Sequence, residues 1–200
     1  MGFMFAPRYH PAMRHVAPVR KSLGVRTAFN ILGPLLNPAS APFALVGVYS
    51  PDLLQLMAET LQRLGLQRAL VVNSMGIDEL TPCAPAEVLE VTPGRLRRYS
   101  LHPSEVGIAT CTLEDLRGGD AATNAQMLRD AFGGQRGAVA DALCLNAGVA
   151  LVAAGLAASP AEGVAMAQEV QRRGAPGDVL SRWVARSQEL YAAELATAVV

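Results

Sequence analysis

Apolar residues follow two different periods in the middle of the chain. Residues 43–49 and 68–73 form largely apolar runs of strand length, which are typical of strands covered on both faces. Between them, residues 53–64 carry apolar side chains at helical spacing, after a Ser50-Pro51 start signal and before Gly65. The pattern predicts a β–α–β unit whose strands are parallel and whose crossover is right-handed.

Further along the chain, the pattern predicts a hairpin and several helices. Thr92-Pro93-Gly94 separates the strand-like residues 86–91 and 95–101. Helices are predicted over residues 11–23, 120–132, 139–154, 159–174 and 178–190, and a loop over residues 30–42. We therefore predict the α/β class, with a mixed, largely parallel sheet flanked by helices. One domain is expected over residues 1–190, with a frayed Ala-rich tail over residues 191–200.

The composition excludes several classes of protein. Hydrophobic residues make up 51% of the chain and charged residues 17%, which is enough for a substantial core and leaves apolar surface for a partner. Lys+Arg and Asp+Glu balance at 17 each, so no global field attracts nucleic acid or a membrane surface. The longest apolar run, residues 147–158, is too short to span a bilayer. Cys83, Cys111 and Cys144 lack metal-ligand spacing and are interpreted as reduced structural thiols.

Two adjacent carboxylates follow the second predicted strand. Residues 73–79 leave the carboxyl end of that strand, where ligands bind in open α/β sheets, and Gly76 allows the backbone to turn. Magnesium is typically held by one or two carboxylates, several waters and substrate phosphate oxygens. Asp78 and Glu79 are therefore candidates for a metal–phosphate site. From their spacing alone, a solvated or helix-capping acidic pair is the more common explanation.

The first 38 residues combine prolines and glycines with the basic residues His10, Arg20 and Arg26. A guanidinium group matches a carboxylate in two parallel hydrogen bonds, so Arg20 is a candidate for binding a small planar anion. His10 lies at the start of the first predicted helix and could bind a ligand or cap that helix. A surface or ion-pair role remains the alternative for Arg20. The position of this segment predicts that the chain starts inside a larger protein.

The segment Leu116-Arg117-Gly118-Gly119-Asp120 has the glycines of a phosphate loop but lacks the strand that should precede one. Because Asp120 fits as a helix cap, we interpret the segment as a turn. The sequence shows no Ser–His–Asp arrangement, no Walker or dinucleotide glycine pattern and no nucleic-acid signature.

Five blocks of sequence carry a specific resemblance through their order and approximate spacing. They are FAPRYHPAMRHVAPVRKSLGVRTAFNILGPLLNP, LVGVYS, GIDEL, LEDLRGGDAATNAQMLRDAFGG and LCLNAGVAL. Together they resemble the C-terminal part of the anthranilate phosphoribosyltransferase family, from the start of the chain to about residue 174. The resemblance implies transfer of the phosphoribosyl group of phosphoribosyl pyrophosphate (PRPP) to the amine of anthranilate, with release of pyrophosphate, in tryptophan biosynthesis. It also implies an α/β domain joined to a helical N-terminal domain, and a homodimer.

The resemblance further implies roles for single residues. Arg20 would grip the anthranilate carboxylate, and Asp78 and Glu79 would hold Mg²⁺ on the pyrophosphate. The path of anthranilate would be lined by His10, Ala6, Pro7, Met13 and Gly33. No acid–base residue is implied.

The family's Gly-Thr-Gly-Gly-Asp phosphate loop, its Lys-His-Gly segment and most of its helical domain lie upstream of the matching region. We therefore expect this chain to hold about half of the active site and to be inactive alone. Two alternatives remain: a non-catalytic remnant or ligand- or partner-binding module of the same fold, and a pentosyltransferase acting on nucleosides. The FNILGPLLNP and HPAM blocks match the nucleoside enzymes less well. A bacterial source would place the protein in the cytoplasm, and a plant or algal source in the plastid.

Overall fold

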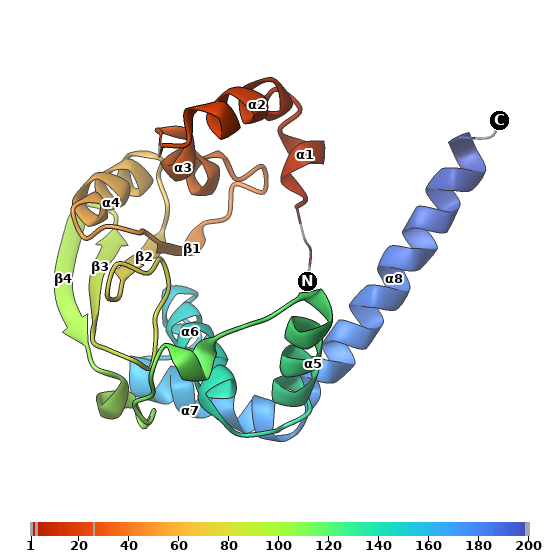
Figure 1. The fold of residues 1–200 in the computed structure, drawn as a ribbon. Helices are drawn as coiled ribbons and strands as arrows, with labels where there is room; N and C mark the ends of the chain where they lie inside the picture. Colours follow the sequence, from red (N-terminus) through yellow and green to blue (C-terminus); the bar gives the residue numbers. More distant parts are fainter. Residues whose placement is uncertain (1, 3, 26, 199–200) are drawn as a thin grey trace.

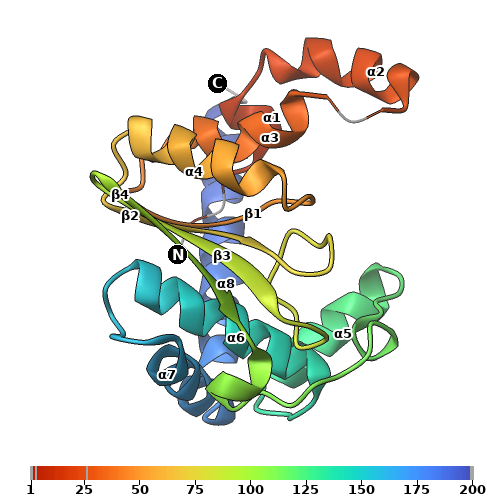
Figure 2. The same cartoon turned by 90° about the vertical axis from the view of Figure 1, so that its left-hand side faces the viewer.

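A four-stranded mixed sheet forms the centre of the fold, with helices on both of its faces (Figures 1 and 2). The computed structural model describes residues 2, 4–25 and 27–198, without the side chains of Pro7 and residues 196–198. The strands are β1 (Phe43–Gly47), β2 (Arg68–Asn73), β3 (Ala86–Thr92) and β4 (Arg95–Leu101), in the spatial order of the chain. The α/β class expected from the hydrophobic pattern is confirmed.

The pairing of the described strands corrects one part of the prediction. β1 and β2 are parallel and α4 (Leu53–Arg63) connects them, as the β–α–β pattern predicted. β2–β3 and β3–β4 are antiparallel, so the expectation of a largely parallel sheet is wrong for these four strands. The tight Thr92-Pro93-Gly94 turn explains the β3–β4 direction, since such a turn can join only antiparallel neighbours. β2 and β3 are connected by residues 74–85, which contain no helix that could serve as a parallel crossover, so β3 returns antiparallel to β2.

Alternating residues of β2 pack into two separate hydrophobic cores, one on each face of the sheet. Ala69 and Val71 pack with α4 on one face of the sheet. Leu70 and Val72 pack with α6 (Ala138–Ala153) on the other face, where α7 (Pro160–Arg172) lies behind α6. Because a strand alternates its side chains between faces, one short apolar run fills both cores. Figure 2 shows the sheet between the α4 layer and the α6–α7 layer.

A cluster of one carboxylate and two arginines on the sheet is hydrogen-bonded to the end of α6. The buried carboxylate of Glu90 on β3 accepts a hydrogen bond of 2.8 Å from Arg68 Nε and one of 2.9 Å from Arg97 Nε. Arg68 Nη1 also donates to the carbonyl oxygen of Val152 at 2.7 Å. Burial alone would raise the pKa of Glu90, but the hydrogen bonds and charges of the two arginines outweigh burial and lower that pKa.

The N-terminal arm, defined as residues 4–42, consists of short helices with little buried surface. Its elements are α1 (Ala6–Tyr9), α2 (Met13–Leu23), α3 (Phe29–Leu32) and the 3-10 helix Gly33–Leu36. The expected helix stop at Gly24 is confirmed by its φ of 63°. The expected loop over residues 30–42 is wrong in its first half, where α3 and the 3-10 helix form. None of the described residues before Val46 is buried.

The last helix is longer than its apolar pattern predicted. α8 runs over Ala175–Ala198 and continues through most of the segment expected to fray, because alanine has the highest intrinsic helix propensity. α5 (Ala121–Phe132) packs against α8, which projects away from the sheet (Figure 1). Across residues 2, 4–25 and 27–198, no helix combines the length and apolar character needed to cross a membrane. The domain limits inferred from sequence stay a prediction.

Candidate active site

The loop after β2 is held in one shape by its own backbone and by Asn73. Ile77 N donates to Ser74 O at 2.8 Å and Ser74 N to Ile77 O at 3.1 Å, which closes a tight turn. Met75 and Gly76 make this turn with φ values of 55° and 79°. The buried Asn73 Nδ2 donates to Val48 O at 2.6 Å, so the loop is also tied to the end of β1.

The carboxylate pair follows directly from this turn and is pressed against β1. A Cβ placed on Gly47 would lie 1.5 Å from the backbone oxygen of Asp78, so only glycine permits this close approach. Asp78 and Glu79 themselves are exposed. The loop backbone is therefore fixed while both carboxylates remain available to a ligand.

A cleft of about 510 Å³ opens beside the two carboxylates. Its wall combines β1, β2 and α6 with the chain just before α5. Apart from Asp78 and Glu79, its lining consists of Leu45, Gly47, Val72, Leu116, Val139, Ala142, Leu143 and Asn146. This lining is mostly apolar and its charged groups are the adjacent Asp78 and Glu79, an arrangement common in sites that bind small ligands.

Asn146 anchors the loop to α6, a role that was not predicted from the sequence. Its Nδ2 donates to Leu80 O at 2.7 Å, and its Oδ1 accepts from Leu80 N at 3.1 Å. These two hydrogen bonds hold the backbone of Leu80, the residue after Glu79, against α6. A lone asparagine within the apolar block LCLNAGVAL was the available signal, because a polar group at such a position needs partners.

The two carboxylates of the loop fit Mg²⁺ better than a cation whose ligands must all come from the protein. Within the described part of the chain, no cluster of three or more His, Cys, Asp or Glu side chains is placed to hold a metal. Magnesium needs only one or two carboxylates when waters and phosphate oxygens complete its shell. Asp78 and Glu79 supply that number at an accessible edge of the sheet.

The Gly118-Gly119 segment is a turn, as interpreted from the sequence. Gly119 N donates to Asn124 Oδ1 at 2.8 Å, and Asn124 Nδ2 donates to Gly119 O at 3.0 Å. Asp120 caps α5 by accepting from Thr123 N at 2.8 Å, and this backbone hydrogen bond lowers the pKa of Asp120. The Gly119 amide is therefore used inside the turn.

The residues expected to line the anthranilate path lie along the N-terminal arm. Ala6 begins α1, and His10 follows its end and donates its backbone N–H to Ala6 O at 2.8 Å. Met13 opens α2, the half-buried Arg20 lies in its last turn, and Gly33 opens the 3-10 helix. Pro7 is in α1, and its side chain, like all of Arg26, lies outside the described structure.

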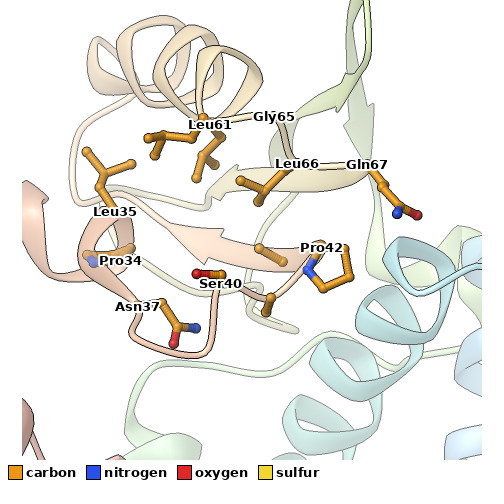
Figure 3. A pocket seen from close by; sticks show the side chains of 12 residues that line it. Pro34, Leu35, Asn37, Ser40, Pro42, Leu61, Gly65, Leu66 and Gln67 are labelled. Atoms are coloured by element: carbon orange, nitrogen blue, oxygen red, sulfur yellow. The ribbon is translucent and has the colours of Figure 1, made fainter.

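The structure does not bring this arm to the carboxylate loop. In both ribbon views α2 lies beyond α3 and α4, apart from the loop after β2 (Figures 1 and 2). The arm instead borders a second cavity of about 250 Å³, where Pro34 and Leu35 face Leu61 and Leu66 near the end of α4 (Figure 3). The lining of this cavity has no titratable side chain, so the cavity offers packing surface without acid–base chemistry.

The β1–α4–β2 unit, with its acidic loop at the carboxyl end of a strand, defines an α/β domain. A family model described as "Glycosyl transferase family, a/b domain" matches residues 1–176, and the chain belongs to this family.

Known relatives agree with this assignment. Anthranilate phosphoribosyltransferase of Mesorhizobium japonicum is 47% identical over 184 residues, which are 92% of this chain and 55% of the relative. The crystal structure of the Thermus thermophilus enzyme of that name matches with a TM-score of 0.87 at 50% identity, over 92% of this chain and 55% of that chain. The Saccharomyces cerevisiae enzyme in complex with PRPP and Mg matches with a TM-score of 0.78 at 28% identity, over 86% and 50% of the two chains. This chain thus spans about half the length of these relatives.

Proposed function

We propose that this chain supplies the α/β part of an anthranilate phosphoribosyltransferase. The observation that carries the proposal is the exposed Asp78–Glu79 pair, held rigidly beside an apolar cleft in a chain of this family. The activity is the transfer of phosphoribosyl from PRPP to the amine of anthranilate, with pyrophosphate leaving. The names of the relatives and the PRPP–Mg complex of the yeast enzyme support this choice of substrates and cation.

In this proposal, Asp78 and Glu79 hold the cation that accompanies pyrophosphate. When bound, Mg²⁺ would neutralise charge that develops on the leaving group. The two carboxylates need a fixed backbone for this task, and the contacts of the loop with Gly47 and Asn146 provide one.

Arg20 is proposed to orient anthranilate through its carboxylate, with His10, Ala6, Pro7, Met13 and Gly33 along the acceptor path. Transfer requires the amine to come within about 3–3.5 Å of the ribose carbon that it attacks. Since α2 lies apart from the acidic loop, the arm must approach the sheet edge for the reaction. The two halves of the proposed site thus occupy different parts of the chain.

A chimera tests the proposal directly. The part of the Mesorhizobium japonicum relative that precedes its matching region is joined to this chain, and anthranilate consumption is measured with PRPP and Mg²⁺. We expect turnover by the chimera and none by the 200-residue chain alone. Asp78→Asn should lower kcat about 100-fold and shift its Mg²⁺ dependence. Arg20→Ala should mainly raise KM for anthranilate, by about 10- to 100-fold.

Matched controls separate these effects from changes of the surface charge. Asp178→Asn removes an exposed carboxylate from the first turn of α8, and Arg63→Ala removes an exposed arginine from the last turn of α4. Neither should change kcat or KM. A folded chimera that binds anthranilate without turnover would favour the non-catalytic module. Unchanged kinetics in both Asp78→Asn and Arg20→Ala would reject the site assignments.

Two further expectations belong to this proposal. The bacterial relatives favour the cytoplasmic alternative for the compartment. The homodimer implied by the resemblance stays a prediction, which the molar mass of the chimera in light scattering would test.

A further inference from the structure

Two cysteines that are far apart in the sequence meet beside the acidic loop. Cys83 Sγ and Cys111 Sγ are 3.4 Å apart, within hydrogen-bonding distance for two thiols, and both residues are half-buried. Their separation of 28 positions explains why spacing rules did not reveal the pair. The remaining cysteine, Cys144, is buried in α6.

The backbone around Cys83 is tied to the acidic loop. Cys83 N donates to Thr81 Oγ1 at 3.2 Å, and Ser74 Oγ donates to Ala84 O at 3.2 Å. Ser74 belongs to the turn that presents Asp78 and Glu79. Cys83 is therefore placed by the same hydrogen-bond network as the carboxylates.

Cys111 is attached to another part of the cleft wall, the chain before α5. The next residue, Thr112, donates its backbone N–H to Asp115 Oδ2 at 2.8 Å and its hydroxyl to the same oxygen at 2.7 Å. This turn leads directly into Leu116, which lines the cleft with Asp78 and Glu79. A bond between the two sulfurs would join the segment that carries the acidic loop to the segment that carries Leu116.

We propose that Cys83 and Cys111 form an oxidative modification site, which closes to an intramolecular disulfide on reaction with a low-molecular-weight disulfide such as oxidised glutathione. One cysteine thiolate attacks the glutathione disulfide and releases one glutathione thiolate, which takes up a proton. The second cysteine thiolate then attacks the mixed disulfide and releases the second glutathione. The two protein thiols lose two electrons and two protons, and one oxidised glutathione becomes two reduced molecules.

The environment of the pair makes this reaction slow. Burial, the hydrogen bond with Cys83 and the nearby carboxylates of Asp115 and Asp141 raise the pKa of Cys111 to about 11. Because only the thiolate attacks a disulfide, attack by Cys111 is slow and closure requires prolonged exposure to the oxidant.

Thiol counting on the full 200-residue chain tests the site. After incubation with oxidised glutathione, we expect loss of two of its three thiols, a mass decrease of about 2 Da and a linked peptide pair containing Cys83 and Cys111. Cys144→Ser is the matched control and should close the same bond. Cys83→Ser and Cys111→Ser should each stop at a mixed disulfide with glutathione.

Three results would overturn the proposal. The first is that all three thiols remain free when the chain is oxidised for a prolonged time and then denatured for counting. The second is a linked peptide that contains Cys144. The third is a disulfide found only between two chains. Because peptide mapping of the unsubstituted chain is decisive, the test does not depend on the folding of the serine variants.

Discussion

Gly47 shows how a single residue without a side chain positions the carboxylate pair. Its backbone lies against the carbonyl group of Asp78, at a distance that leaves no room for a Cβ atom. The contact is between backbone atoms of β1 and the loop after β2, so rotation of a side chain cannot relieve a clash there. The position of Asp78 and Glu79 therefore depends on a glycine that carries no chemistry.

Gly47→Ala should displace the acidic loop and destabilise the fold. Overpacking of this kind typically costs about 1–3 kcal/mol, and contact with rigid backbone places the expected loss near the upper end. Urea denaturation, followed by circular dichroism, would measure the change in the free energy of unfolding. Gly177→Ala is the matched control, because its added Cβ would meet only an ordinary contact at 3.6 Å. Equal stability of the two variants would contradict the close approach seen in the structure.

The sequence predicted residues whose role is local better than residues whose role depends on distant contacts. Asp120 was recognised as a helix cap because its partner, Thr123, lies three positions away. Asn146 was missed because its partner, Leu80, is 66 positions away, and the pairing of Cys83 with Cys111 was missed for the same reason. Contacts of this kind become visible only when the fold brings separate elements together.

At the scale of elements, two helices pack closely enough for their backbones to touch. A Cβ on Gly148 of α6 would lie 2.4 Å from Val164 N, and one on Gly163 of α7 would lie 2.2 Å from Gly148 O. Both glycines are buried. The α6–α7 pair thus forms one rigid layer, and α6 from this layer supplies Asn146 and much of the cleft wall.

Gly163→Ala should destabilise the protein although alanine is the better helix former. The gain in helix propensity is about 1 kcal/mol, whereas forcing a methyl group against a backbone carbonyl costs up to about 3 kcal/mol. We expect a net loss of about 1–2 kcal/mol in thermal or urea unfolding. The double variant Gly148→Ala/Gly163→Ala should lose less than the sum of the two single losses, because both substitutions disturb the same contact. A stabilised Gly163→Ala variant would contradict the packing.

Elements with strong periodic patterns were predicted well, and their partners less so. The β1–α4–β2 unit, the β3–β4 hairpin and the start of α5 follow from local signals. The largely parallel sheet was wrong because strand direction depends on which strands become neighbours. The helix α3 was missed although Asn30 Oδ1 accepts a local hydrogen bond from Thr27 N at 2.8 Å, because a helix of only four residues is too short to show a periodic apolar pattern.

At the scale of the whole molecule, burial divides the chain into two regions of different expected stability. The sheet and its flanking helices hold two apolar cores, whereas none of the described residues before Val46 is buried. Ile31 and Leu35 contact the core beneath α4, while α2 contributes no buried residue. An ion pair between Arg8 and Glu194 links α1 to α8, but both side chains are more than half exposed, and such pairs contribute about 0–1 kcal/mol.

This division predicts that α2 opens without unfolding of the sheet. Local opening needs little free energy where few apolar contacts are lost, so amide hydrogens of Met13–Leu23 should exchange at least about 100-fold faster than those of β2 and α6. Hydrogen–deuterium exchange with mass spectrometry on the full chain measures this difference directly.

In the chimera, anthranilate should slow the exchange of α2 if the arm closes on its substrate, and Arg20→Ala should remove that protection. Protection of α2 equal to that of β2 in the isolated chain would show that the arm is already fixed, and the approach required for transfer would then have to come from another part of the protein.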